Sequence, residues 1–147
     1  MDLDQLTDYG QLDPSGMGEW IEDLPQQCQQ ARRLALDFAL PAFGEIRQVV
    51  ILGMGGSAIG GDLLRVLLER EAKTPFFVNR AYDLPGFVGP ETLVIASSYS
   101  GNTEETLAGY QEAKGRGAKL LAITTGGKLA QKAEADGVGT IFIPGGL

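Results

Sequence analysis

Histidine is absent from this sequence of 147 residues, and cysteine occurs once, at Cys28. A Ser-His-Asp mechanism within the chain is therefore excluded, because that mechanism uses an imidazole as its base. A single cysteine excludes an intrachain disulfide, and together with the lack of histidine it excludes an ordinary structural zinc site. We expect no bound metal.

Positive charge is also scarce, since 12 lysines and arginines face 19 aspartates and glutamates and give a net charge of −7. Such a chain has little attraction for nucleic-acid phosphates or for anionic lipid surfaces. No apolar run approaches the roughly 18 residues of a membrane span, and the first residues lack the basic-then-apolar pattern of a secretion signal. We expect a cytoplasmic protein with no nucleic-acid partner and no membrane partner.

Five short apolar runs are typical of buried strands, and helical patterns separate most of them. The runs span residues 49–52, 76–78, 92–96, 119–123 and 140–143. The helical patterns span about 57–71, 103–115 and 127–136, whereas 80–91 is turn-rich and replaces a further crossover helix. This alternation predicts an α/β fold with a five-stranded parallel sheet between helices, a three-layer αβα sandwich of the flavodoxin-like type.

The chain is long enough for one ordinary domain, which we place at residues 45–147. We expect residues 1–44 to form a helical segment that packs on the core of that domain. Its main helix is predicted at 25–40, where Pro25 suits the first turn and an apolar stripe follows.

The loop after the first predicted strand is rich in glycine and opens a helix. It reads Gly-Met-Gly-Gly-Ser over residues 53–57. Such a turn presents backbone N–H groups and the positive end of a helix to an anion, with Gly56 and Ser57 as candidate ligands. Gly53-x-Gly55-x-x-Ala58 also satisfies the dinucleotide fingerprint, and Asn79-Arg80 suits a 2′-phosphate, so an NADP-binding Rossmann domain is an alternative. A second alternative is that these glycines bind nothing and only allow the helix to pack closely on the sheet.

The loop after the third predicted strand carries more specific chemistry. It reads Ser-Ser-Tyr-Ser-Gly-Asn-Thr-Glu-Glu-Thr over residues 97–106. We expect Asn102 to cap the following helix with Glu105 three residues on, which leaves hydroxyl and amide groups for an oxyanion. An ordinary Ser-rich loop before a capped helix is the alternative. The candidate ligands in this loop are Ser98, Tyr99, Ser100 and Thr103.

A third loop, residues 124–128, reads Thr-Thr-Gly-Gly-Lys and follows the fourth predicted strand. Since the carboxyl ends of parallel strands share one edge of a sheet, we expect this loop on the same rim as the other two. There it either lines the sugar part of a ligand or is a simple turn.

At these residues the sequence resembles the sugar isomerase (SIS) domain, through Gly-Gly-Ser57 and Ser98-Tyr-Ser100-Gly-Asn-Thr103. The longer strings at 53–62, 98–106 and 124–129, and the closing Ile-Pro-Gly-Gly-Leu, resemble the amino-terminal half of the bifunctional phosphoglucose/phosphomannose isomerase family. The resemblance implies that Ser57, Ser98, Ser100 and Thr103 hold the phosphate of glucose 6-phosphate, mannose 6-phosphate or fructose 6-phosphate. It also implies a reaction without metal or other cofactor, through a cis-enediol.

By that resemblance the catalytic Glu, His and Lys belong to a second SIS domain that these 147 residues do not include, so no catalytic residue is assigned within the chain. We expect the sugar-phosphate-binding half of an aldose-ketose isomerase, inactive alone, with a homodimer or the missing second domain as partner. A free-standing SIS domain that senses a sugar phosphate is the first alternative. The NADP-binding domain is the second.

Overall fold

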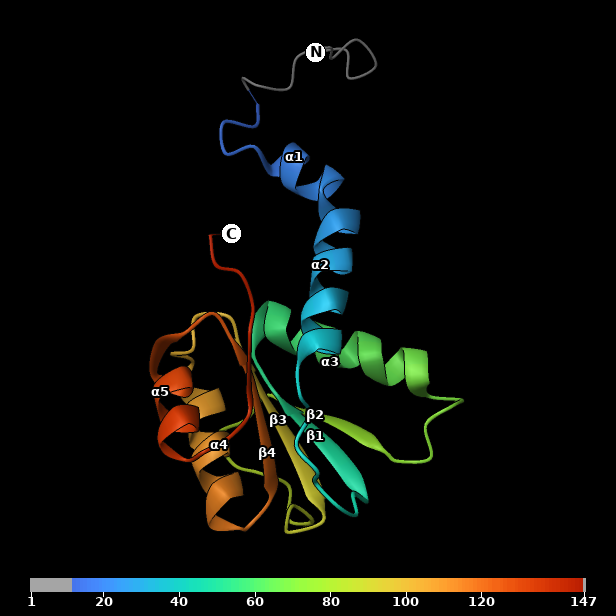
Figure 1. Ribbon diagram of the computed structural model, residues 1–147, viewed down its shortest axis with the longest axis vertical. Helices are drawn as coiled ribbons and strands as arrows, with labels where there is room; N and C mark the ends of the chain where they lie inside the picture. Colours follow the sequence, from blue (N-terminus) through green and yellow to red (C-terminus); the bar gives the residue numbers. More distant parts are fainter. Residues whose placement is uncertain (1–11, 147) are drawn as a thin grey trace. The chain divides into compact units, whose positions relative to one another are not determined.

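The computed structural model describes residues 12–146, and the chain divides into two units, residues 1–37 and 38–147 (Figure 1). In the first unit, α1 (Met17–Glu22) is followed by α2 (Leu24–Asp37). The Asp13 carboxylate accepts the backbone N–H groups of Gly18 and Met17 at the start of α1, and these bonds lower the pKa of Asp13. Helix α2 ends at Asp37 rather than at residue 40, because Leu40 precedes a proline and such a residue disfavours helical dihedrals.

The second unit is built on a sheet of five parallel strands in the order β2-β1-β3-β4-β5. The predicted fold class is therefore confirmed, and each strand coincides with a predicted apolar run to within two residues. The strands are β1 (Gln48–Leu52), β2 (Phe76–Asn79), β3 (Thr92–Ser98), β4 (Lys119–Thr124) and β5 (Thr140–Phe142).

Three helices cover the two faces of this sheet: α3 (Gly55–Leu68) on one face, and α4 (Glu104–Gly115) and α5 (Gly127–Ala135) on the other (Figure 1). Neighbouring strand residues point to opposite faces. Accordingly, Gly61 of α3 packs against the Ile51 side chain, whereas Gly109 of α4 packs against the Leu52 side chain.

The main hydrophobic core lies on the face that α4 and α5 cover, and it includes Val50, Leu52, Val94, Ala96, Tyr110 and Leu129. The connection between β2 and β3 contains no helix within residues 80–91, as the turn-rich sequence predicts. It adds Leu84 and Val88 to this core in place of a helix. The Leu84 N–H donates to the Glu112 carboxylate at 2.9 Å, which holds this connection on α4 and lowers the pKa of Glu112.

Strands β1 and β3 are neighbours, but the chain leaves them for opposite sides of the sheet, toward β2 and β4. The loops that follow β1 and β3 therefore diverge, and in open α/β sheets ligands bind in the crevice at such a point. Within residues 12–146, no helix combines the length and the apolar character needed to cross a membrane.

Candidate functional site

A cavity of about 640 Å³ lies at the carboxyl ends of β1 and β3. It is formed by the turn into α3, by the loop after β3 and by the residue that follows β5. Its lining residues are Met54, Gly56, Ser57, Gly60, Ser97, Tyr99, Ser100, Thr103 and Ile143. The structure therefore brings together five of the six residues predicted to bind phosphate, and only Ser98 is not part of the lining.

The turn into α3 depends on two glycines. Gly55 has a φ of +52°, in the left-handed region that favours glycine. A Cβ atom on Gly53 would lie 3.0 Å from the carbonyl carbon of Ser57, so the helix begins directly against the end of β1. The first-turn N–H groups of a helix have no partner within the helix and carry its positive partial charge. Gly56 and Ser57 stand in that first turn and line the cavity. The Ser57 N–H donates to the carbonyl of Met54, the N-cap, at 3.1 Å, so Ser57 offers the cavity its hydroxyl rather than its N–H.

The loop after β3 holds its hydroxyl groups in fixed positions. The Ser98 side chain is 2% exposed, and its Oγ accepts the Gly101 N–H at 3.1 Å and lies 2.9 Å from the Thr103 Oγ1. The Ser100 Oγ accepts the Asn102 N–H at 3.2 Å. Ser98 therefore lies one layer behind the cavity, in contact with a residue that lines it.

The predicted cap of α4 is wrong. The N-cap is Thr103 rather than Asn102, and the helix begins at Glu104, which places Asn102 one residue too early to cap it. The Asn102 Oδ1 instead accepts the Lys128 N–H at 3.1 Å, in the first turn of α5. Glu104 and Glu105 then occupy the first turn of α4, where the helix dipole favours carboxylates.

Residues 124–128 run from the last residue of β4 into the first turn of α5, and none of them is among the lining residues of the cavity. The Thr125 hydroxyl donates instead to the Tyr99 carbonyl at 2.7 Å. The third loop therefore does not line this cavity, and whether it contacts the sugar part of a ligand or is a simple turn stays open.

The polar side chains that line the cavity are all uncharged. Charged groups stand outside the lining: Arg80, which follows β2, forms an ion pair with Asp62 on α3. The Tyr82 hydroxyl lies 3.4 Å from the Glu104 carboxylate, and the negative charges of Glu105 and Glu104, together with partial burial, raise its pKa. In the part of the chain that the structure describes, no three Cys, Asp or Glu side chains are grouped so as to hold a metal ion.

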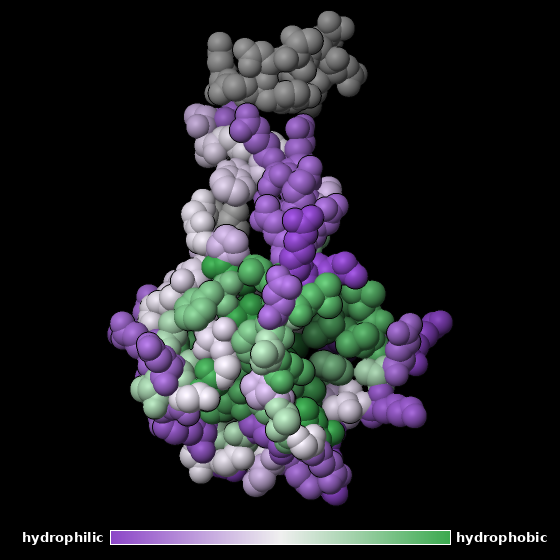
Figure 2. Space-filling model, viewed as in Figure 1, coloured by the Kyte–Doolittle hydropathy of each residue, from purple (hydrophilic) through white to green (hydrophobic). Residues whose placement is uncertain are grey.

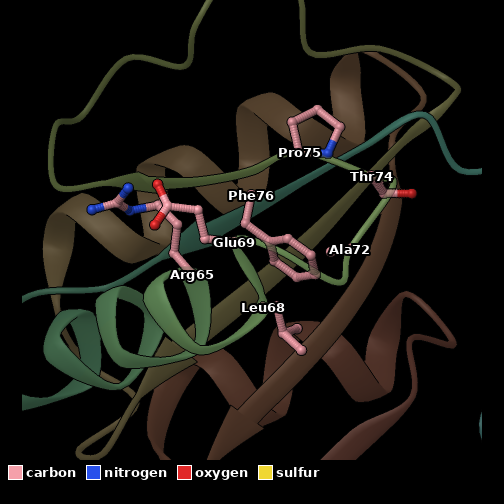
Figure 3. Close-up of a pocket in the computed structure, with 7 residues that line it drawn as sticks. All are labelled: Arg65, Leu68, Glu69, Ala72, Thr74, Pro75 and Phe76. Carbon is pink, nitrogen blue, oxygen red and sulfur yellow. The ribbon is translucent and has the colours of Figure 1, made fainter.

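A second hollow, of about 170 Å³, lies where the end of α3 meets the start of β2 (Figure 3). Its lining residues are Arg65, Leu68, Glu69, Ala72, Thr74, Pro75 and Phe76, and none of them was predicted as a site residue. It adjoins the amino end of a strand, opposite the edge where parallel α/β sheets bind ligands. The cavity at the ends of β1 and β3 is therefore the candidate site.

Sequence reasoning missed four lining residues: Met54, Gly60, Ser97 and Ile143. For Ser97 the sequence did contain a signal, the alternation of side-chain direction along a β-strand. Buried and half-buried residues alternate along β3 up to its last residue, so Ser97 and Ser98 point to opposite faces and only Ser97 reaches the cavity. Ile143 had no such signal, because the cavity includes it only through the pairing of β4 with β5.

The fold and site together define a class: a parallel α/β domain with a neutral, hydroxyl-rich cavity at the switch point of its sheet. Residues 43–142 match the SIS domain family, and the chain belongs to that family. This membership favours the interpretation of the Gly53–Ala58 turn as part of a sugar-phosphate site over its interpretation as a dinucleotide fingerprint.

Two relatives and one solved structure show where the similarity lies. The sequence is 55% identical over 132 residues to the bifunctional phosphoglucose/phosphomannose isomerase of Caldicellulosiruptor bescii, a match that covers 89% of this chain and 39% of that protein. It is 50% identical over 104 residues to the protein of the same name from Thermoplasma acidophilum, covering 71% of this chain and 31% of that one. The crystal structure of tagatose-6-phosphate ketose/aldose isomerase from Escherichia coli matches with a TM-score of 0.60 and 25% identity, over 85% of this chain and 37% of that chain. This chain thus spans 39% or less of the length of each.

Proposed function

We propose that the cavity at the ends of β1 and β3 binds the phosphate group of a sugar phosphate. One observation carries the proposal: the first turn of α3 and two oriented hydroxyl groups, those of Ser100 and Thr103, meet at one cavity with no charged side chain in its lining. Backbone N–H and hydroxyl donors at helix N-termini bind phosphate without an arginine. The names of the similar enzymes, which act on sugar phosphates, support the same ligand class.

The hydrogen bonds in the loop suggest how each hydroxyl contributes. The Ser100 Oγ accepts the Asn102 N–H, so its own hydrogen is available to a phosphate oxygen. The Ser98 Oγ accepts the Gly101 N–H and can donate to the Thr103 Oγ1, which leaves the Thr103 hydrogen for the ligand. In this proposal Ser57, Ser100 and Thr103 contact the phosphate, Gly56 and Tyr99 shape the cavity around it, and Ser98 orients Thr103.

We further propose that the chain is part of an isomerase that interconverts glucose 6-phosphate or mannose 6-phosphate with fructose 6-phosphate. The support is the identity with the Caldicellulosiruptor bescii enzyme, whose name gives both activities. Aldose-ketose conversion moves a proton between C1 and C2 and needs a base of suitable pKa beside them. None of the residues lining the cavity has a carboxylate, imidazole or amine. The base therefore comes from outside this lining.

The exposed apolar face of α3 supports the proposal that this chain binds a protein partner. Within α3, four large apolar side chains are more than half exposed: Ile59, Leu63, Val66 and Leu67. Figure 2 shows hydrophobic residues gathered at the position of α3. Contiguous exposed apolar surface of this kind marks protein-protein contact. In our proposal a second copy of the chain or a further SIS domain covers this face, and since α3 begins at the cavity, the same partner is placed to supply the base.

Calorimetric titration with fructose 6-phosphate tests the phosphate site. Ser100→Ala should raise the dissociation constant at least roughly tenfold, because it removes a hydrogen bond to a charged group. Ser15→Ala is the matched control, since Ser15 is exposed and its hydroxyl donates to Asp13 within its own turn. Binding that is equally strong in both variants would contradict the proposed site, as would binding of NADPH in place of the sugar phosphate.

A sensor of sugar phosphates is the second candidate function, favoured by the lack of an acid-base group in the cavity lining. The two candidates differ in turnover. An isomerase converts fructose 6-phosphate to an aldose phosphate once its partner surface is present, whereas a sensor binds the sugar phosphate and leaves it unchanged. The expected cytoplasmic location stays a prediction.

A further inference from the structure

The loop that follows β4 faces the loop after β3. The Tyr99 carbonyl accepts two hydrogen bonds from Thr125, one from its N–H at 3.1 Å and one from its hydroxyl at 2.7 Å. The carbonyl of Gly101 accepts the Leu129 N–H at 2.8 Å, and the Asn102 Oδ1 accepts the Lys128 N–H at 3.1 Å. Four donors, the N–H groups of Thr125, Lys128 and Leu129 and the Thr125 hydroxyl, are thus directed at residues 99–102.

The two loops are in direct backbone contact. A Cβ atom on Gly101 would lie 1.8 Å from the Gly126 carbonyl oxygen, and one on Gly127 would lie 2.4 Å from the Ser100 carbonyl oxygen. Both glycines also have φ near +70°, at +67° and +70°. The N-cap residue of α5 is Gly126, which has no side chain that could cap the helix. The start of α5 is therefore capped by the neighbouring loop, through Asn102 and Gly101.

We infer that Thr125 and Asn102 are positioning residues for the phosphate site: they form an inter-loop clamp that holds Ser100 in its binding geometry without touching the ligand. The inference rests on the proposed function. The clamp fixes the chain on both sides of Ser100, through the Tyr99 carbonyl before it and through Asn102 after it. Asn102 also bonds Ser100 directly, since its N–H reaches the Ser100 Oγ at 3.2 Å and its Nδ2 donates to the Ser100 carbonyl at 3.0 Å.

The fixed geometry has a consequence for binding. Hydrogen-bond donors that are already in place lose little conformational freedom when a ligand arrives, so a preorganised loop binds more tightly than a mobile one with the same groups. Removing the Thr125 hydroxyl takes away one of the two hydrogen bonds to the Tyr99 carbonyl, and removing the Asn102 side chain takes away its bonds to Ser100 and Lys128. Either change leaves every ligand-contacting group present and weakens only their preorganisation. The expected effect is weaker sugar-phosphate binding with the contacting residues unchanged.

Thr125→Val tests the clamp, with Thr140→Val as the matched control. Each variant replaces a threonine whose hydroxyl donates to a backbone carbonyl, Tyr99 in the first case and Val138 in the second. We expect fructose 6-phosphate to bind about fivefold to tenfold more weakly to Thr125→Val than to Thr140→Val, in line with the loss of one hydrogen bond. Thr125→Ser, which keeps the hydroxyl, should restore binding, and Asn102→Ala should weaken it as Thr125→Val does.

Amide hydrogen exchange gives a second readout that needs no ligand. The Gly101 and Asn102 N–H groups both bond within the clamped loop. Their exchange should accelerate in Thr125→Val and stay at the wild-type rate in Thr140→Val, because local opening exposes only the amides whose loop has been released.

The two measurements separate the possible failures. If the wild-type chain binds fructose 6-phosphate and Ser100→Ala does not, but Thr125→Val matches Thr140→Val, the clamp is refuted while the proposed function stands. If the wild-type chain binds no sugar phosphate, the proposed function fails and the exchange rates still decide whether Thr125 holds the loop. Equal exchange in the two threonine variants would overturn the inference in either case.

Discussion

Gly101→Ala should destabilise the protein much more than the same substitution at Gly137. The two glycines have nearly the same φ, +67° and +66°, so an alanine at either position meets the same left-handed strain of roughly 1–2 kcal/mol. Nothing lies within 4 Å of a Cβ at Gly137, whereas at Gly101 the Gly126 carbonyl oxygen would be 1.8 Å away.

That overlap requires the two loops to separate, and overpacking of this kind costs about 1–3 kcal/mol. Alanine also restricts the unfolded chain, an effect of opposite sign and about 0.4–1 kcal/mol, but it acts equally on both variants and cancels in their difference. We therefore expect Gly101→Ala to lose about 1–3 kcal/mol more free energy of unfolding than Gly137→Ala.

Urea unfolding followed by circular dichroism measures this difference directly, with the denaturant slopes compared to confirm that both variants unfold in the same way. Gly101→Ala should also weaken fructose 6-phosphate binding, and Gly137→Ala should not. Equal free energies of unfolding for the two variants, to within about 0.5 kcal/mol, would refute the direct backbone contact between the loops.

Three further predictions concern the core, the pH dependence of stability and the α3 face. Thr106→Val should raise the free energy of unfolding by about 1 kcal/mol in urea melts, because the buried Thr106 hydroxyl has no hydrogen-bond partner among the described residues. Burial, and secondarily the Asp136 carboxylate, raises the pKa of Tyr110 above its ordinary value of 10.0, so the wild type should lose stability as the pH rises above about 10. Tyr110→Phe should lose less over that range in thermal melts. Leu67→Lys should reduce self-association or partner binding in sedimentation experiments, because Leu67 is 76% exposed on α3.

Most of the fold was predictable from local patterns. Strands buried on both faces give continuous apolar runs, and β1 and β4 were found from such runs. Helix α2 was predicted three residues too long, because its apolar stripe continues through Phe38 while the approach to Pro41 ends the helix. The predicted boundary between residues 44 and 45, and the packing of the first segment on the core, stay predictions.

Five of the nine residues that line the candidate site were predictable from the sequence, and their hydrogen-bonding roles were less so. Ser57, Ser100 and Thr103 reach one cavity because they follow β1 and β3, whose carboxyl ends adjoin. Asn102 was assigned to the wrong helix, since capping patterns within one segment contain no information about the loop that the register of β3 and β4 brings alongside. Contacts between segments distant in sequence need the sheet order, which no local pattern supplies.

A crystal structure of the chain with fructose 6-phosphate would test the central claim most directly. We predict a phosphate group within hydrogen-bond distance of the Ser57, Ser100 and Thr103 hydroxyls and of the backbone N–H group at Gly56. A phosphate bound elsewhere, such as in the hollow between α3 and β2, or an unchanged cavity at saturating sugar phosphate, would contradict the assignment of the site.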